Sequence, residues 1–368
     1  MDSSRKKRLG QYFSGQKVAE LLVSMVALHH EDHVIDPMAG IGDMLVATMD
    51  AGVAKSNISG IEIDHLAGKT CNDRIGLGTV IVADAFKLET YNILKRTSWD
   101  AVITNPPYVR YQSLNGFDNQ ALTLQNAKET RNSLLSIIRE VKHLSKEERN
   151  CLLRITRSYS GLSDLAVPAW ILCASIVAPG GTLAIVVPES WLNREYALSI
   201  KYLLLKFFDI QYVVEDLNSA WFPDALVKTN LIVAKRVAFR KEFAIEPQGK
   251  YKHIRIASSL IGENSLVDNM QYLGYTGKKA FLTLLNAEND VRENGFTLKI
   301  VPTCSMVSEM VNTPAFNKLY TKLEHTKIPN ASRSFPDELC TILNAHDTIC
   351  PISNLQSWGF MVGQGLRT

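Results

Sequence analysis

Short apolar runs recur along the first third of the chain, and each is followed by a polar residue and then by a helical pattern. Four such runs predict buried strands, at residues 33–35, 58–63, 79–83 and 101–104. The polar residues that end them follow one another at intervals of 21 to 26 residues, namely Asp36, Glu62, Asp84 and Asn105. This spacing is typical of βα units and predicts a parallel sheet. Because ligands bind beyond the carboxyl ends of such strands, we expect the four side chains at the functional edge.

The regular pattern is interrupted between about residues 111 and 163, where the chain is polar and carries amphipathic helical stretches at 132–144 and 146–159. We interpret this segment as an insertion over the functional edge, or as a lid. The pattern then resumes with helices at 165–177 and 198–208 and strands at 183–187, 210–214 and 231–237. It weakens beyond about residue 251, with helical stretches near 278–286 and 305–323. The Gly-rich, apolar end of the sequence has no natural stop, so we expect that the chain continues or that a partner completes it.

The composition is that of a globular protein. Hydrophobic residues make up 46% and charged residues 21% of the 368 positions, which excludes a disordered or collagen-like chain. At roughly 150 residues per domain, the length predicts two domains or one large α/β domain with an appendage. The cysteines are scattered without a CxxC pair, and the histidines have no metal-ligand spacing. With neither a signal peptide nor an apolar run near the ~18 residues of a membrane span, we expect a reduced, cytoplasmic protein without a metal.

Basic residues are concentrated in one stretch of a nearly neutral chain. The formal net charge is +3, but residues 231–256 carry seven Lys or Arg against two Glu. Such a stretch either follows the phosphates of a nucleic acid or is a solvated surface, and the sequence favours neither alternative.

A Gly-rich turn follows the first predicted strand, over Asp36-Pro37-Met38-Ala39-Gly40-Ile41-Gly42-Asp43. Glycines allow the backbone to pass close to a ligand. The third glycine of a GxGxxG pattern is replaced by Leu45, which argues against a pyrophosphate-containing dinucleotide and for a ligand without phosphates. The alternative is an ordinary strand-to-helix loop.

Two carboxylates follow the next two strands. Glu62 is placed to accept hydrogen bonds from the two hydroxyls of a ribose. Asp84, with Ala85 and Phe86 beside it, is placed to accept a hydrogen bond from an adenine amino group. The alternative for both is a solvated loop carboxylate.

The most informative motif is Asn105-Pro106-Pro107-Tyr108 at the end of the fourth strand. Two consecutive prolines stiffen the turn and remove two backbone donors, so the Asn105 side-chain oxygen and the Pro106 carbonyl remain as fixed acceptors. Two such acceptors suit a planar NH2 group, since binding both hydrogens favours a pyramidal nitrogen with an exposed lone pair. Tyr108 supplies a flat face for the ring that bears the amine. A Pro-rich turn that is capped by Asn is the alternative.

These motifs, in this order, resemble a known family. Asn105 to Tyr108 is similar to the catalytic motif of amino-methylating methyltransferases that use S-adenosylmethionine. The Gly-rich turn, Glu62 and Asp84 resemble their cofactor motifs, and Gly10-Gln11-Tyr12-Phe13-Ser14 resembles their N-terminal cofactor-contacting motif. The order along the chain resembles the γ class of N6-adenine DNA methyltransferases, which includes the methylase parts of type I and type IIG restriction–modification systems. The resemblance covers about residues 9–236.

The resemblance implies a fold and a division into segments. The fold is the Rossmann-like class I methyltransferase fold, an α/β architecture with a mixed seven-stranded sheet and helices on both faces. The implied segments are a helical cofactor-contacting segment (1–30), a catalytic domain (31–245) with a helical insertion at about 111–163, and a linker with the start of an incomplete DNA-recognition region (246–368).

The resemblance also implies a set of site residues. Those implied in catalysis are Asn105, Pro106, Pro107 and Tyr108. Those implied in cofactor binding are Gln11, Tyr12, Phe13, Asp36, Met38, Ala39, Gly40, Gly42, Glu62, Ile63, Asp84, Ala85, Asn105 and Pro107. Those implied in holding the target base are Tyr108 and Phe222, although an aromatic residue such as Phe222 is as often simply part of a core.

The implied activity is transfer of a methyl group from S-adenosylmethionine to N6 of an adenine that is flipped out of double-stranded DNA, in a restriction–modification or phage-defence system. A specificity subunit, a nuclease partner or a further C-terminal domain is the expected partner. Methylation of a protein glutamine is one alternative, although such enzymes place a helical domain before the catalytic domain. A partner-dependent DNA-binding or assembly subunit of a restriction complex is another.

Overall fold

The computed structural model describes residues 15–76, 80–107, 126–159, 166–222 and 228–326, together with Ile328. The chain divides into two compact units, residues 1–327 and 328–368, and nearly all of the described residues belong to the first. Residue 245, where the resemblance implies a boundary between segments, lies within the first unit, and the division into segments stays a prediction.

The four predicted parallel strands all form and lie side by side, as β1 (Val34–Asp36), β2 (Ile58–Glu62), β3 (Val80–Val82) and β4 (Trp99–Thr104). In the sheet, β1 lies between β4 and β2, and β3 follows β2, with every pair parallel. Three later strands extend the sheet beyond β4, namely β5 (Val177–Pro188), β7 (Thr229–Arg236) and β6 (Phe208–Asp216). Because β7 is antiparallel to both of its neighbours, these seven strands form the mixed sheet that the resemblance implies.

Three further strands make the sheet ten-stranded, so the expected strand number of seven is too small. They are β8 (Lys250–Ile256), β12 (Phe296–Pro302) and β11 (Val291–Glu293). β8 is parallel to β6, β12 is antiparallel to β8, and β11 is antiparallel to β12. The sequence obscures β8 because its exposed positions are mostly cationic, which looks like a charged loop. Its buried positions, Ile254 and Ile256, nevertheless alternate with the period of two that a strand requires.

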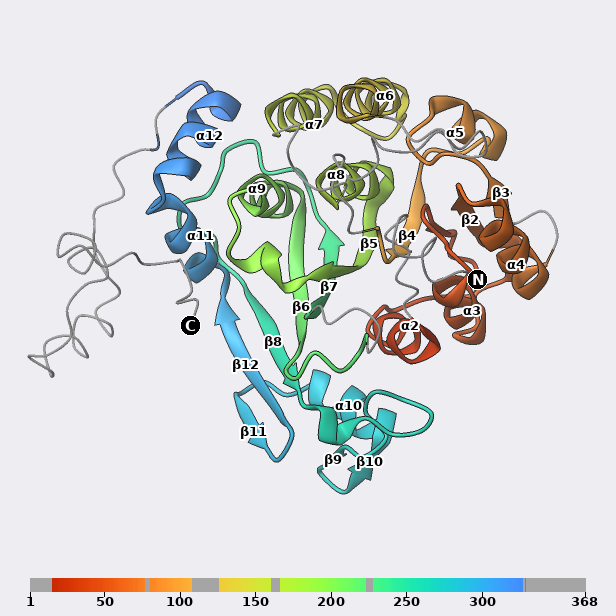
Figure 1. Ribbon diagram of the computed structural model, residues 1–368. Helices are drawn as coiled ribbons and strands as arrows, with labels where there is room; N and C mark the ends of the chain where they lie inside the picture. Colours follow the sequence, from red (N-terminus) through yellow and green to blue (C-terminus); the bar gives the residue numbers. More distant parts are fainter. Residues whose placement is uncertain are drawn as a thin grey trace, which may run out of the picture. The chain divides into compact units, whose positions relative to one another are not determined.

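The remaining elements complete the unit. The helices are α2 (Gly15–Ser24), α3 (Asp43–Asp50), α4 (His65–Ile75), α5 (Leu88–Leu94), α6 (Ala127–Glu140), α7 (Lys146–Ser158), α8 (Ala166–Ile176), α9 (Ala197–Phe207), α10 (Gly277–Leu285), α11 (Thr303–Val311) and α12 (Pro314–Glu324). Short 3-10 turns lie at Lys55–Asn57, Glu189–Leu192 and Ser258–Leu260, and a small hairpin consists of β9 (Gln271–Tyr272) and β10 (Tyr275–Thr276). Figure 1 shows α8 and α9 on one side of the sheet and α2 and α3 on the other.

Helix α8 is covered by two further helices because its whole surface is apolar. Every residue from Ala166 to Ile176 is buried, so the helix is apolar all round and needs protein on its outer side as well as against the sheet. Helices α6 and α7 contact α8 and form that outer layer, as Figure 1 shows. Each starts with a capping box, Asn126 with Glu129 and Ser145 with Glu148.

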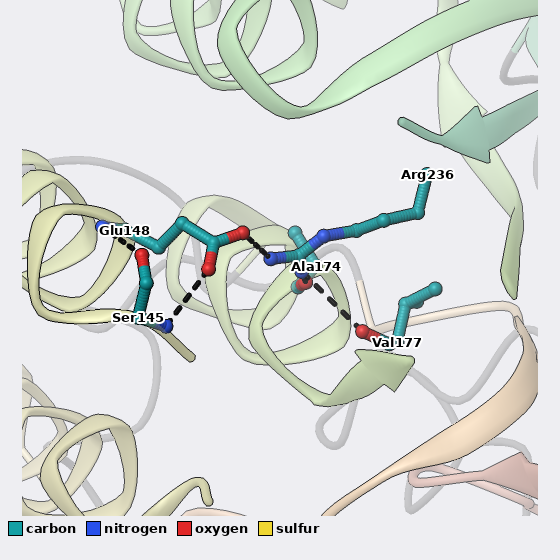
Figure 2. Close-up of polar contacts among 5 residues, drawn as sticks. All are labelled: Ser145, Glu148, Ala174, Val177 and Arg236. Atoms are coloured by element: carbon teal, nitrogen blue, oxygen red, sulfur yellow. Dashed lines mark hydrogen bonds and ion pairs between the residues drawn. The ribbon is translucent and has the colours of Figure 1, made fainter. Parts of the chain in front are cut away.

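A buried ion pair fixes α7 to the sheet. Arg236 at the end of β7 is 2% exposed, and its guanidinium donates to Glu148 at 2.7 Å and to the carbonyls of Ala174 and Val177 at 2.9 and 3.3 Å, as Figure 2 shows. Val177 is where β5 begins, so this link lies at the edge opposite the carboxyl ends of the parallel strands. The start of α7 is therefore not positioned as a lid over the functional edge.

Candidate active site

The four strand-end residues of the sequence pattern lie along one edge of the sheet. Asp36 and Glu62 are the last residues of β1 and β2, and Asn105 directly follows β4. Asp84 comes two residues after β3, whose last residue pairs with Glu62. Because the strand order is β4-β1-β2-β3, the side chains follow one another as Asn105, Asp36, Glu62 and Asp84. Their common edge is what the spacing predicts, whereas their chemical roles stay predictions.

The Gly-rich turn is folded onto the end of β2. The Ala39 N–H donates to the Ile61 carbonyl at 2.8 Å, and the Gly40 N–H donates to Glu62 Oε2 at 2.7 Å. Gly40 and Gly42 have φ values of 55° and 90°, which suit glycine. A Cβ atom on Gly42 would lie 2.7 Å from the Cys71 sulfur, so this turn has no room for a larger residue.

The glycine that the GxGxxG comparison finds missing is replaced by one on the neighbouring strand. Leu45 is fully buried, and its Cδ1 would lie 2.7 Å from a Cβ atom on Gly60 in β2. The close approach of helix and strand is therefore achieved by Gly60. Gly60 was not among the predicted site residues, although a lone glycine inside an apolar strand pattern is a signal of close approach.

The carboxylates of this edge are held in an unfavourable environment. Asp36 is 1% exposed, and its pKa is raised to about 7, mainly because of burial and further because of the negative charges of Glu62 and Asp43. Burial also raises the pKa of Glu62, although the backbone N–H groups of Asp64 and Gly40 oppose this by donating to its carboxylate. A positive charge placed among these groups would be stabilised, whereas a phosphate would be repelled.

An ion pair that was not predicted from the sequence, Arg74 with Asp43, also holds the Gly-rich turn in place. Arg74 in the last turn of α4 donates to Asp43 Oδ1 and to the Ile41 carbonyl, both at 2.7 Å. The other oxygen of Asp43 accepts a hydrogen bond from the Gly15 N–H at 3.1 Å, at the start of α2. Asp43 thus connects the Gly-rich turn, α4 and α2. Arg74 and Asp43 are 31 positions apart in the sequence, so no local pattern indicates the pair.

The predicted amine-binding turn is described only in part. Asn105 is half-buried, Pro106 is buried and Pro107 is half-buried. Tyr108 lies outside the described residues, as do the predicted cofactor contacts Gln11, Tyr12 and Phe13.

The other predicted contacts lie close to the edge. The Met38 N–H donates to Asp36 Oδ1 at 2.9 Å, and the Phe86 N–H donates to Asp84 Oδ1 at 2.8 Å. Ile63 is half-buried next to Glu62, and Ala85 is buried next to Asp84.

Phe222 is packed as a core residue in this structure. Its side chain is 6% exposed and belongs to the same hydrophobic cluster as Trp221, so its ring offers little surface to a base. Its role as a contact of the target base stays a prediction.

Three of the seven Lys and Arg residues in the basic stretch at residues 231–256 have structural roles. Arg236 is buried in its ion pair, and Arg240 donates to the carbonyls of Leu205 and Phe208 at 3.0 and 2.9 Å. Lys252 donates to the Leu285 carbonyl. For these three residues neither expected alternative is correct, because they hold the fold together instead of covering a surface.

Arg255, in the same stretch, is exposed and lines a hollow. A hollow of about 510 Å³ lies over the added strands, and the cations that line it are Arg255, Arg292 and Lys299, with His253 beside them. The carboxylates of Glu215 and Asp290 also line it, and Glu215 pairs with both His253 and Arg255 at 3.2 Å. Arg292 and Lys299 are exposed, and neither forms an ion pair with another described residue.

None of the described helices has the length and apolar character that a membrane crossing requires.

Comparison with known proteins gives a consistent result. Residues 2–153 match the sequence model of the family described as N-6 DNA methylase. The type II methyltransferase M.HincII of Haemophilus influenzae is 26% identical over 122 residues, which cover 33% of this chain and 22% of that protein. The matched part therefore spans about a fifth of the length of the curated relatives.

Solved structures show the same fold. The type IIG restriction endonuclease BpuSI matches with a TM-score of 0.53 and 15% identity, over 82% of this chain and 31% of that chain. The methyltransferase subunit of a type I restriction–modification system from Streptococcus thermophilus matches with a TM-score of 0.53 and 14% identity, over 81% of this chain and 56% of that chain. The fold is the class I methyltransferase fold that the motifs imply. Residues 2–153 are similar to the N-6 DNA methylase family, and this match confirms the resemblance carried by the motifs.

Proposed function

We propose that this chain transfers a methyl group from S-adenosylmethionine to N6 of an adenine in double-stranded DNA. The observation that carries the proposal is the position of Asn105, which follows β4 immediately beside β1 with its buried Asp36. An acceptor for an amine thus adjoins a set of carboxylates that suits a cationic nucleoside.

The donor set at the edge fits S-adenosylmethionine. The Gly-rich turn is hydrogen-bonded to Glu62 through the Gly40 N–H. Because Gly40 and Gly42 have no side chains, a ligand can approach the backbone of the turn next to the carboxylates. The crowding of negative charge around Asp36 opposes phosphate-containing cofactors and favours a sulfonium ion. In the proposal, Glu62 holds the ribose hydroxyls and Asp84 holds the adenine amino group. When bound, S-adenosylmethionine supplies the electrophilic methyl group.

Asn105 and Pro106 would orient the acceptor amine. The Asn105 side-chain oxygen and the Pro106 carbonyl accept the two N6 hydrogens, which directs the nitrogen lone pair away from them. The proton is lost only as the new bond forms, so no base is required beforehand. Catalysis would consist mainly of positioning and electrostatics.

The hollow over the added strands supports DNA as the substrate. Four strand spacings of about 4.8 Å separate β4 from β8, so Arg255 stands roughly 19 Å along the edge from Asn105. At 3.4 Å per base pair this corresponds to about five or six base pairs of a duplex lying across the edge. Arg255, Arg292 and Lys299 would then contact phosphates. The family match also supports adenine over a protein glutamine.

The test is methylation of unmethylated genomic DNA with tritiated S-adenosylmethionine, followed by nucleoside analysis. We expect label in N6-methyladenine from the wild type and none from Asn105→Ala, while Asn105→Ala still binds S-adenosylmethionine in equilibrium dialysis. Wild-type levels of transfer by Asn105→Ala, or label in protein glutamine instead of DNA, would contradict the proposal.

A further inference from the structure

A leucine occupies a turn position that disfavours it. Leu273 and Gly274 connect β9 to β10, and their φ values are 48° and 78°. Tyr272 pairs with Tyr275 across this two-residue loop. Positive φ at both loop residues is the pattern of a type I′ turn, in which Asn-Gly is the favoured sequence. A bulky apolar side chain in the left-handed region is strained.

Folding does not account for this leucine. Its side chain is 72% exposed, the highest value among the large apolar side chains that the structure describes. The other described non-glycine residues with positive φ differ from it, since Lys95 and His325 end helices and Ser219 is small and polar. Leu273 therefore contributes neither burial nor a cap, and its strain points to a contact outside the monomer.

The base of the hairpin is fixed. The ring of Tyr272 packs edge-on against Phe296 with centroids 6.0 Å apart, and Phe296 is the first residue of β12. The Gly277 N–H donates to the carbonyl of the fully buried Met270 at 2.8 Å. The leucine is thus presented at the tip of a hairpin whose base is packed against β12.

The hairpin also stands at the functional edge. β8 ends at Ile256, which pairs with Asp216 at the carboxyl end of β6, and Figure 1 shows β9 and β10 beyond the end of β8, next to α10. Beside the tip, Lys279 Nζ lies 4.3 Å from the centroid of the exposed Tyr275 ring, and Lys278 is exposed. An apolar tip flanked by an aromatic ring and two cations is complementary to a base step between phosphates.

We infer that Leu273 is a wedge that enters a base step of the bound duplex, with Lys278 and Lys279 on the flanking phosphates. This inference rests on the proposed function. A base leaves its stack only when the step is opened, and apolar side chains inserted between base steps open them. Such a wedge kinks the duplex over the functional edge, which brings the duplex into contact with more of the protein surface.

The test compares Leu273→Asn with Leu282→Asn, a matched change at an exposed leucine on α10. Three quantities are measured for each: the melting temperature, the affinity for a fluorescein-labelled 30-base-pair duplex by anisotropy, and the initial rate of methyl transfer to unmethylated genomic DNA. We expect Leu273→Asn to melt at or above the wild-type temperature, since asparagine suits the turn. We expect its duplex affinity to fall at least threefold and its transfer rate at least tenfold, while Leu282→Asn matches the wild type. Leu273→Met should retain most of the rate.

Each opposite outcome identifies what fails. If Leu273→Asn binds and methylates DNA like the wild type, the wedge is wrong and the proposed function stands. If the wild type binds no duplex, the wedge is wrong as well. If Leu273→Asn loses duplex affinity but the wild type transfers no methyl group to DNA, the contact stands and the proposed function fails. A change of oligomeric state in size-exclusion chromatography, with unchanged duplex affinity, would assign Leu273 to an interface between copies and overturn the inference.

Discussion

The buried carboxyl group of Asp36 makes the stability of the protein depend on pH in an unusual direction. Its ordinary pKa is 3.8, but burial and the neighbouring Glu62 and Asp43 raise it to about 7. Between these values the unfolded chain releases the proton while the folded protein retains it. The stabilisation is therefore complete below pH 3.8 and is lost as the pH rises to about 7. At about 1.36 kcal/mol per pKa unit, the loss is about 4 kcal/mol.

Replacing Asp36 by Asn should remove this loss. The asparagine oxygen still accepts the Met38 N–H, and the new amide group lies beside the Thr104 hydroxyl, which can accept from it. If that amide stays without a partner, the cost is about 1–3 kcal/mol. We therefore expect Asp36→Asn to be more stable than the wild type at pH 8 by about 1–4 kcal/mol.

Urea unfolding followed by tryptophan fluorescence, at intervals from pH 5 to pH 8.5, measures the difference. The free energy of unfolding of the wild type should decline across this range, and that of Asp36→Asn should decline less. Asp50→Asn, at an exposed aspartate at the end of α3, is the matched control and should follow the wild type. If Asp36→Asn were less stable than the wild type at pH 8, with an unchanged dependence on urea, burial of the Asp36 charge would not be what destabilises the protein at this pH.

Three further changes test the structure around the site. Arg236→Met leaves Glu148 partly buried without its cation, so the free energy of unfolding in urea should fall by about 3–5 kcal/mol. Adding Glu148→Gln, which retains the cap on α7, should recover part of this loss. If the effects of the two changes were fully additive, the residues would not be a coupled pair. Arg74→Gln releases the Ile41 carbonyl and Asp43, so the KM for S-adenosylmethionine should rise with kcat little changed, whereas a selective loss of kcat would assign Arg74 a different role. Gly60→Ala places a Cβ atom 2.7 Å from Leu45 and should cost about 1–3 kcal/mol in unfolding, and a smaller residue at position 45, as in Leu45→Val, should restore stability.

The edge of the site was predictable because it depends on local patterns. A strand that is buried on both faces reads as an apolar run, and the polar residue that ends it marks the carboxyl edge. Asp36, Glu62 and Asn105 were located in this way without any knowledge of strand order. The structure supplies the order of the strands, which determines which of these residues are neighbours along the edge.

The supporting contacts were not predictable because their partners are distant in the sequence. Arg236 looks like one member of a basic stretch, yet its partner Glu148 lies 88 positions away on a helix that covers α8. Charge counts cannot separate such an arginine from an exposed one such as Arg255. The added strands were missed for a related reason, since cationic residues at exposed strand positions conceal the alternation of β8.

The carboxylates at the edge and the leucine at the hairpin tip have the same kind of energetic role. Asp36 is buried at a cost that the fold would avoid with asparagine, and Leu273 is strained at a position that asparagine would also relieve. Both costs are recovered only when a ligand of the right kind is present. A cation at the edge lowers the pKa of Asp36, and an opened base step buries Leu273. Binding of S-adenosylmethionine should therefore tighten as the pH rises from 6 to 8 in the wild type and lose this dependence in Asp36→Asn, a result that isothermal titration calorimetry measures directly. An unchanged pH dependence in the variant would mean that the charge of Asp36 does not contribute to cofactor binding.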